Sequence, residues 1–325
     1  VGGTHVRAAA IDSEGQILSS RREPTPRCVD DFREWIVHAV QHIHEDTANG
    51  PVVAVGLALP GVVDSERGVV IRSVNLPFLE GRLLRDELSK RARLAFTLMT
   101  DADAATWGEY TSCTPHPKAF VHLRLGTGVA CGIVVDNRLQ PTDPDRTTHW
   151  KVLVVDDHPD AIACPCGLRG CLETIASGPA LEAQARKMGF TDGLVALQKA
   201  WERNEPAARK IVDRVAAALV SFICNLKSQI QDCPLPHPPT ADGSDPSISP
   251  DIVFSFGGGV ITALPCLLEQ TTKHLRSFDD DFTRRVSVHP SRLGDEAGVI
   301  GAARLARAAR SESSLPSEPR TGVNG

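Results

Sequence analysis

No stretch of the 325-residue sequence approaches about 18 consecutive apolar residues, so no segment is expected to span a membrane. The first residues show no signal peptide. Neither sign of charge is in large excess, because the net charge at pH 7 is only −5, and a mildly acidic chain has no general attraction to nucleic acid or anionic lipid. We therefore expect a protein that binds neither nucleic acid nor a membrane.

Most of the cysteines show no clustering. Six of the nine are scattered along the chain: Cys28, Cys113, Cys131, Cys224, Cys233 and Cys266. Scattered thiols without a secretion signal favour a reducing compartment, so the expected location is cytoplasmic.

The two common nucleotide-binding fingerprints are also missing. No Gly-Lys-Ser/Thr follows a glycine-rich turn, and no G-x-G-x-x-G precedes a helix. Three other glycine turns nevertheless adjoin expected strands: GGT at 2–4, GTG at 126–128 and GGG at 257–259. Backbone N–H groups in such turns bind phosphate, and glycine permits the close approach. Three turns spread over both halves of the chain predict a nucleotide triphosphate bound at a cleft.

Strands and helices succeed each other in both halves, which predicts an α/β protein of two related domains with a cleft between them. We expect an N-terminal domain at 1–116 and a C-terminal domain at 117–309, with the last helix packing back on the first domain. The Pro-, Ser- and Asp-rich stretch 233–250 predicts a disordered insertion, and 310–325 a disordered tail. Single helices are expected at about 172–188, 205–231 and 260–275.

Three further cysteines fall within eight positions. Cys164, Cys166 and Cys171 can surround one ion if Gly167 and Gly170 let the backbone turn tightly. Such a density of thiolates suits zinc, which takes four ligands, and a site filled by four protein ligands is structural. His149 and His158 are the upstream choices for the fourth ligand. The alternatives are a disulfide or small buried thiols.

Three acidic residues lie beside these features. Asp101 directly follows the expected strand 95–100, where open α/β sheets place ligands, and could accept a proton from an alcohol that attacks a γ-phosphate. Asp103 is better explained as a helix cap or as a charge favoured by the helix dipole. Glu173, two residues after Cys171, is either a substrate contact or an ordinary acidic residue of a first helical turn.

Taken together, these segments resemble the ROK family of sugar kinases and sugar-responsive repressors, from Val1 to about Ala309. The most specific match is CPCGLRGCLE at 164–173, which fits the family zinc pattern Cys-x-Cys-Gly-x-x-Gly-Cys-x-Glu at every defined position. The other matching segments are VGGTHVRAAAID, LALPGVVD, SVNLPF, TDADAATWGEY, LRLGTGVACGIVVDNRL, FSFGGGVITALP and DEAGVIGAARLA.

The resemblance implies a fold with two RNase H-like domains of the actin/hexokinase type, which binds ATP and Mg²⁺ and phosphorylates a hexose or N-acetylhexosamine hydroxyl. Asp101 would be the general base, and Asn75, His149 and Glu173 would contact the sugar. His149 would also be the fourth ligand of a structural Zn²⁺ with Cys164, Cys166 and Cys171. The phosphates would bind the three glycine turns, at Gly2, Gly3, Thr4, Gly126, Thr127, Gly128 and Gly258. The family also implies a homodimer or higher homo-oligomer.

The chain departs from the family at several sugar-side positions. The Asp that positions Mg²⁺ would stand two places before Gly2, ahead of Val1. Thr100 replaces a sugar-binding Asn, and Asp103 replaces a second Asn. Arg146 stands where Gly-Glu-x-Gly-His has a sugar-contacting Glu, and no other Glu occurs between Glu109 and Glu173. These changes leave a second hypothesis open, a catalytically impaired protein that binds sugar or nucleotide as a sensor.

Overall fold

The computed structural model describes residues 1–45, 50–140, 154–156, 158, 160–231 and 251–313. The predicted insertion at 233–250, most of the predicted tail, and both Arg146 and His149 lie outside the described residues. The chain forms two compact units. Unit 1 holds Val1–Ala104 and the segment from Gly298 onwards, and unit 2 holds Ala105–Ala297. The predicted first boundary was after residue 116, whereas the first crossing between the units lies earlier, inside a helix.

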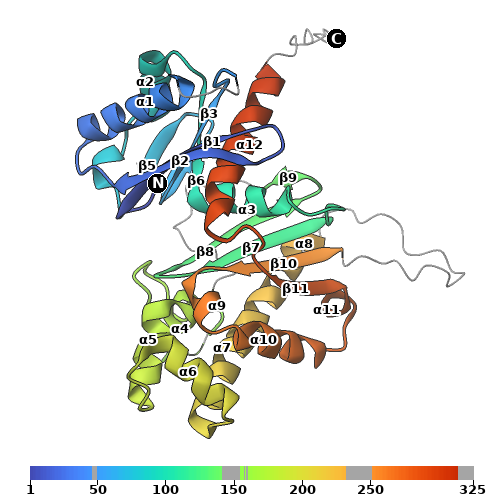
Figure 1. Ribbon diagram of the computed structural model, residues 1–325. Coiled ribbons are helices and arrows are strands. Elements are labelled where there is room, and N and C mark those ends of the chain that lie inside the picture. Colours follow the sequence, from blue (N-terminus) through green and yellow to red (C-terminus); the bar gives the residue numbers. More distant parts are fainter. Residues whose placement is uncertain (46–49, 141–153, 157, 159, 232–250, 314–325) are drawn as a thin grey trace, which may run out of the picture. The chain divides into compact units, whose positions relative to one another are not determined.

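The elements of unit 1 succeed each other as strands and helices (Figure 1). They are β1 (His5–Ile11), β2 (Ile17–Pro24), α1 (Val29–Glu45), β3 (Val55–Leu59), β4 (Val62–Asp64), β5 (Val69–Arg72), η1 (Pro77–Leu79), α2 (Leu84–Ala92), β6 (Phe96–Thr100), the first turn of α3 (Asp101–Tyr110) and α12 (Ala297–Ser313). β1 and β2 form an antiparallel hairpin, β4 and β5 a second one, and β3 pairs with β6 in parallel.

The β3–β6 pair is buried on both faces, as expected for a parallel pair. Leu57 and Leu98 belong to the cluster that packs against α1 and α2. Met99 on the other face packs with Ala302 of α12. The approach is so close that a Cβ on Gly56 would lie 2.0 Å from the Ala302 carbonyl oxygen, so only glycine fits there.

Unit 2 is built on a five-stranded mixed sheet of order β11-β10-β7-β8-β9. β10 is parallel to both β7 and β11, and β7 is antiparallel to β8. The strands are β7 (Ala119–Leu125), β8 (Val129–Val135), β9 (Arg138–Leu139), β10 (Ile252–Gly257) and β11 (Val286–Pro290). The helices are α4 (Glu173–Ala176), α5 (Gly178–Lys187), α6 (Gly193–Glu202), α7 (Pro206–Asn225), α8 (Lys227–Gln231), α9 (Gly259–Ala263), α10 (Cys266–Arg276), α11 (Asp281–Arg285) and the 3-10 turn η3 (Gly294–Glu296).

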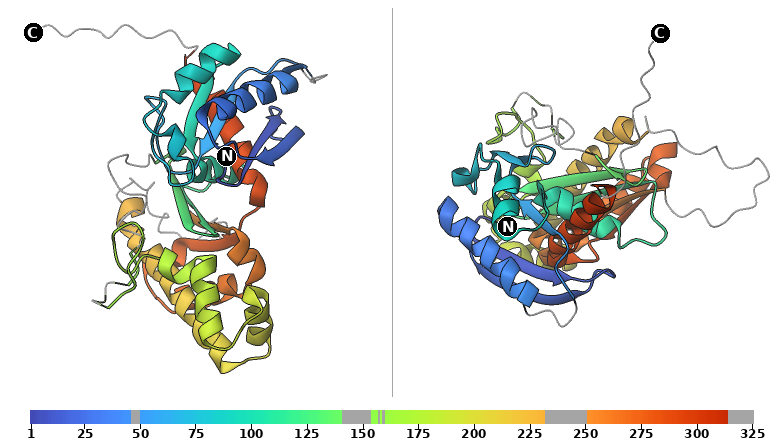
Figure 2. Two further views of the ribbon diagram at one scale, coloured as in Figure 1. Left: turned by 90° about the vertical axis from the view of Figure 1, so that its left-hand side faces the viewer. Right: turned by 90° about the horizontal axis from the view of Figure 1, so that it is seen from above.

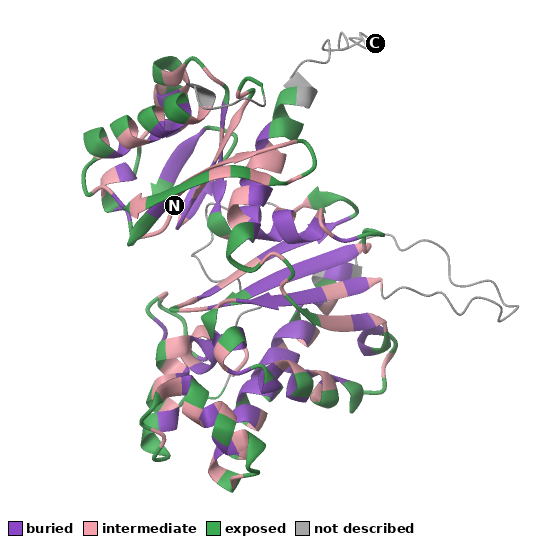
Figure 3. Cartoon of the chain, in the orientation of Figure 1, coloured by how far each residue is buried: buried purple, intermediate pink, exposed green. Residues whose placement is uncertain are grey.

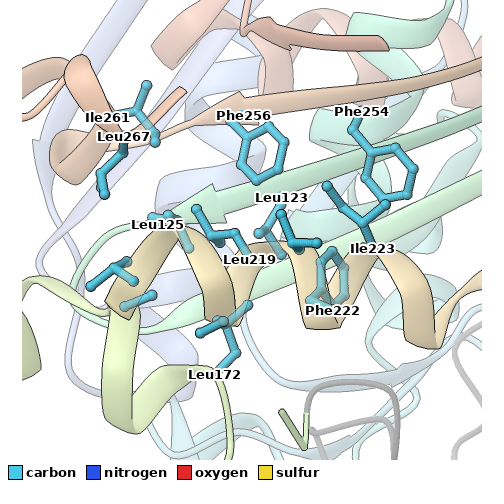
Figure 4. Packing of buried hydrophobic residues seen from close by; sticks show 14 of the residues in the cluster. Leu123, Leu125, Leu172, Leu219, Phe222, Ile223, Phe254, Phe256, Ile261 and Leu267 are labelled. Carbon is cyan, nitrogen blue, oxygen red and sulfur yellow. The ribbon is translucent and has the colours of Figure 1, made fainter. Parts of the chain in front are cut away.

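Both faces of this sheet are covered, and β7, β8 and β10 are buried along most of their length (Figure 3). Alternate residues of β7 and β10, such as Leu123 and Phe254, meet the apolar face of α7 at Leu219 and Phe222 (Figure 4). The intervening residues face the other way, where Phe120 packs with Tyr110 of α3. Figure 2 shows α5, α6 and α7 gathered within unit 2.

Each of the three long helices predicted for unit 2 is interrupted. The segment 172–188 divides into α4 and α5 at Ser177, whose backbone is extended and whose hydroxyl caps α5 by accepting from the Ala180 N–H. Residues 260–275 divide into α9 and α10 at Leu264–Pro265, and 205–231 into α7 and α8 at Leu226. Apolar periodicity continues across these breaks because both pieces pack on the same core, so the pattern alone did not reveal them.

No helix in the described part of the chain has the length and apolar character needed to cross a membrane.

Candidate functional site

In unit 1, three of the predicted site segments lie at one edge of the β3–β6 pair. Leu59 pairs with Thr100 at the carboxyl ends of these parallel strands, so Pro60 and Asp101 leave the pair side by side. The Val1 nitrogen donates to the Ala58 carbonyl at 2.9 Å, close to the ends of the two strands. The turn before β1 therefore reaches the edge from which Asp101 emerges.

The Gly2–Gly3–Thr4 turn is fixed by its own backbone and by a buried threonine. The Gly2 N–H donates to the His5 carbonyl at 2.9 Å, and the Thr25 hydroxyl donates to the Gly2 carbonyl at 2.6 Å. The exposed side chain of Asn75 lies against this turn, because a Cβ on Gly3 would stand 3.2 Å from Asn75 Cβ and Cγ. The structure thus brings together the predicted phosphate turn and a predicted sugar contact.

A buried serine holds the loop that carries Asn75. The Ser73 hydroxyl donates to the Pro60 carbonyl at 2.7 Å and accepts from the Leu76 N–H at 3.2 Å. Nothing in the sequence singled out Ser73, since a serine beside a strand end is common. Its position links the Asn75 loop to the end of β3.

Asp101 occupies the first helical position of α3 and is exposed. The helix is capped by Thr100, whose buried hydroxyl accepts from the Asp103 N–H at 3.0 Å. The hydroxyl of Thr100 is thus engaged by the end of the helix. Asp103 is buried in the same first turn.

In unit 2, the GTG turn connects β7 to β8. The Gly126 N–H donates to the Gly128 carbonyl at 2.9 Å, and Thr127 at the tip is exposed. Two contacts join this turn to the segment after the cysteines: the Gly178 N–H donates to the Gly126 carbonyl at 2.7 Å, and the Val129 N–H donates to Glu173 Oε2 at 3.0 Å.

The second glycine turn of unit 2 lies against the end of β7. Gly258 has a positive φ of 93°, and a Cβ there would lie 2.2 Å from the Leu125 carbonyl oxygen, so this position requires glycine. Leu125 directly precedes Gly126, so the GTG and GGG turns are neighbours. A Cβ on Gly126 or Gly259 would have no atom of the described residues within 4 Å apart from its chain neighbours, so the space beside both glycines is open.

The three predicted thiols meet in space. Each pair of Sγ atoms of Cys164, Cys166 and Cys171 lies within 4.8 Å, and the Cys166–Cys171 distance is 3.6 Å. That spacing is too long for a disulfide and close to the roughly 3.8 Å expected of two thiolates on one tetrahedral zinc. Burial raises the pKa of Cys164 and of Cys171, so their deprotonation calls for a bound cation. The donor set therefore fits zinc.

Tight backbone turns allow this arrangement. Gly170 has a positive φ of 69°, and a Cβ there would stand 1.7 Å from the Asp156 carbonyl oxygen. Gly167 also has a positive φ. His158 does not join the sulfurs among the described residues: its side chain is 68% exposed, and its Nδ1 accepts from the Asp160 N–H at 3.2 Å. His149 lies outside the described residues, so its role stays a prediction.

We expect about one zinc per chain, and we expect Cys164→Ser to lose it. The loss should lower the midpoint of thermal unfolding by roughly 5 °C or more, because the ion would join residues up to seven positions apart and its binding adds to the free energy of folding. Metal analysis by mass spectrometry and a thermal scan measure both effects. The exposed Cys28→Ser serves as control and should keep its zinc; a full zinc complement in Cys164→Ser would refute the site.

Unit 2 also contains a buried polar network that the sequence did not indicate. Glu109 of α3 is 1% exposed and accepts from the Ser291 hydroxyl, from the Arg292 N–H at 2.9 Å and from the Leu293 N–H at 2.8 Å. His122 of β7 is buried on the same face of the sheet, with Nδ1 3.2 Å from the Ser255 hydroxyl. The one available signal was a histidine inside the apolar strand AFVHLRL.

Burial of His122 lowers its pKa to about 4, although the charge of Glu109 acts in the opposite direction. The unfolded chain binds this proton near pH 6.5 and the folded chain only near pH 4, so stability should fall as the pH drops through this window, by up to about 3 kcal/mol. Urea unfolding between pH 7.5 and 4.5 tests this. His122→Gln should show a shallower pH dependence than the wild type, and identical slopes would contradict the assignment.

Comparison with known proteins places the chain in a family. The family model described as "ROK family" matches residues 1–233. A glucokinase of Streptomyces coelicolor is 28% identical, with 94% of this chain and 96% of that protein covered. An N-acetylmannosamine kinase of Haemophilus influenzae is also 28% identical, with 93% and 92% covered.

Solved structures agree with this likeness over almost the whole chain. The ROK hexokinase from Thermus thermophilus superimposes with a TM-score of 0.73 at 25% identity, covering 96% of this chain and 97% of that one. A ROK family glucokinase from Streptomyces griseus, solved with glucose and AMPPNP, gives a TM-score of 0.69 at 27% identity, covering 95% and 97%.

The fold is therefore α/β of the actin/hexokinase type, which confirms the predicted fold class. The chain belongs to the ROK family, as its motifs indicated.

Proposed function

We propose that this protein is an ATP-dependent kinase that phosphorylates a hydroxyl of a hexose or N-acetylhexosamine. The observation that carries the proposal is the position of Asp101, exposed on the first turn of α3, at the edge where the glycine turn and Asn75 also lie. The likeness to a glucokinase and to an N-acetylmannosamine kinase over more than nine-tenths of the chain supports this class of substrate.

In the proposed reaction, the Asp101 carboxylate accepts the proton of the sugar hydroxyl as its oxygen attacks the γ-phosphorus of ATP. A bond forms between that oxygen and phosphorus, and the bond from the γ-phosphorus to the β,γ-bridging oxygen breaks, so that ADP leaves. The Thr100 hydroxyl caps the amino-terminal end of the helix that presents Asp101. When bound, Mg²⁺ would neutralise charge on the phosphates.

The glycine turns are the proposed phosphate sites, with Gly2, Gly3 and Thr4 in unit 1 and Gly126, Thr127, Gly128 and Gly258 in unit 2. The open space beside Gly126 and the exposed tip of the turn at Thr127 support this role, since a ligand can approach the backbone there. Asn75, Glu173 and His149 are the proposed sugar contacts, and His149 with the three cysteines is the proposed zinc site. A homo-oligomer and a cytoplasmic location belong to the same proposal.

A second candidate function is a sugar- or nucleotide-binding sensor with impaired turnover. Its support is that the Thr100 hydroxyl is buried and engaged as a helix cap, where the resembled family offers an amide to the sugar. By resemblance, Arg146 stands in place of a sugar-contacting Glu, which adds to this support because the loss of a hydrogen-bond partner costs about 1–3 kcal/mol.

Release of ADP distinguishes the two functions. The purified protein with ATP, Mg²⁺ and a panel of hexoses and N-acetylhexosamines should release ADP with at least one sugar. A coupled enzymatic assay measures this release. Sugar binding measured by calorimetry without ADP release from any sugar would favour the sensor.

A further inference from the structure

Glu173 makes a contact within unit 2 that a role in sugar binding does not explain. Its Oε2 accepts a hydrogen bond from the Val129 N–H at 3.0 Å, directly after the GTG turn. The carboxylate also fills the space beside Gly128, where a Cβ would stand only 2.8 Å from Oε2. A side chain 44 residues further along the chain is thus seated against the proposed phosphate turn.

The same segment is continuous with the cysteine cluster. Cys171 is fully buried, and the Thr174 hydroxyl of α4 donates to its carbonyl at 2.7 Å. The next helix begins with Gly178, whose N–H donates to the Gly126 carbonyl at 2.7 Å. The turn is therefore held at Gly126 and at Val129 by residues that follow the last cysteine within seven positions.

We propose that Glu173 is a positioning residue for the Gly126–Gly128 turn, and that it transmits the order of the zinc-loaded cysteine cluster to the nucleotide phosphates. This inference rests on the proposed function, because it takes the turn to bind a nucleotide. According to this inference, the binding of zinc to the cysteine cluster increases the affinity for nucleotide even when no sugar is present. A glutamate that served sugar binding alone would leave that affinity unchanged.

The test is calorimetric titration of the zinc-loaded protein with MgADP in the absence of sugar. Glu173→Ala should weaken MgADP binding about tenfold, equivalent to about 1.4 kcal/mol. Glu173→Gln keeps a carbonyl oxygen that can accept from the Val129 N–H, so it should stay within about threefold of the wild type. Glu182→Ala on α5, with a side chain 45% exposed, is the matched control and should bind as the wild type does.

Metal removal supplies a second, independent arm. Chelation of zinc from the wild type should weaken MgADP binding by a similar factor, and added zinc should restore it. In Glu173→Ala, zinc removal should have a smaller further effect than in the wild type, because one of the two contacts between this segment and the turn is already lost. If Glu173→Ala does not fold, Glu173→Asp replaces it, since the side chain shortened by one methylene withdraws the carboxylate from the Val129 N–H.

The outcomes separate this inference from the proposed function. A wild type that binds no MgADP contradicts the proposed function itself. A wild type that binds MgADP, with an affinity that neither Glu173→Ala nor zinc removal changes, overturns the positioning role and leaves the kinase proposal standing. Loss of sugar affinity alone in Glu173→Ala would likewise overturn it.

Discussion

Asp101→Asn is expected to lower kcat for the preferred sugar by about 10²- to 10⁴-fold, the usual contribution of a general base. The amide keeps the size of the side chain and can still accept the Ala102 N–H that Asp101 Oδ1 accepts at 3.0 Å, so α3 should begin as before. It cannot take up the proton of an attacking hydroxyl. The measurement is steady-state ADP release with saturating ATP and sugar.

Two further measurements distinguish a loss of the chemical step from a loss of nucleotide binding or of stability. MgADP affinity and the thermal midpoint should match those of the wild type, because the substitution is isosteric and exposed. Asp86→Asn in the first turn of α2 is the matched control, being another exposed aspartate at a helix start, and should keep full activity. Undiminished turnover by Asp101→Asn would exclude this residue as the base.

Glu109→Ala is expected to lower the free energy of unfolding by about 3–5 kcal/mol. Removal of the buried carboxylate leaves the Ser291 hydroxyl and the N–H groups of Arg292 and Leu293 without their acceptor in a partly buried setting. Glu109→Gln keeps one acceptor oxygen but sets an amide NH₂ against the same donors, so its loss should be smaller. Urea unfolding followed by tryptophan fluorescence measures these differences.

The exposed Glu34 on α1 provides the comparison for this substitution. Glu34→Ala should change stability by no more than about 0.5 kcal/mol. Equal stability of Glu109→Ala and Glu34→Ala would show that the hydrogen bonds to the 291–293 loop contribute nothing net.

Local sequence patterns predicted well those features that depend on neighbouring residues. The strand ending at Thr100 and the helix starting at Asp101 are both present, because Thr100 caps the helix whose first turn is acidic. The clustering of the three thiols likewise follows from short spacing and from glycines with positive φ. The fold class and the family were predicted correctly from such motifs.

Features that join distant parts of the chain could not be predicted in this way. Glu109 and Ser291 are 182 positions apart, and nothing near either residue indicates the other. The contact between Glu173 and Val129 is similarly hidden, since a glutamate in a first helical turn is common for reasons of its own. The requirement for glycine at position 258 arises only from the approach of Leu125. The roles of the site residues remain predictions for the experiments above.

The close packing of Gly56 and Met99 with Ala302 has a consequence for how the chain is synthesised. Unit 1 is completed by a helix encoded after the whole of unit 2, whereas unit 2 is contiguous. After β3 and β6 have left the ribosome, one apolar face of this pair stays uncovered until α12 has been synthesised. The unit made second can therefore finish folding first, reversing the usual vectorial order.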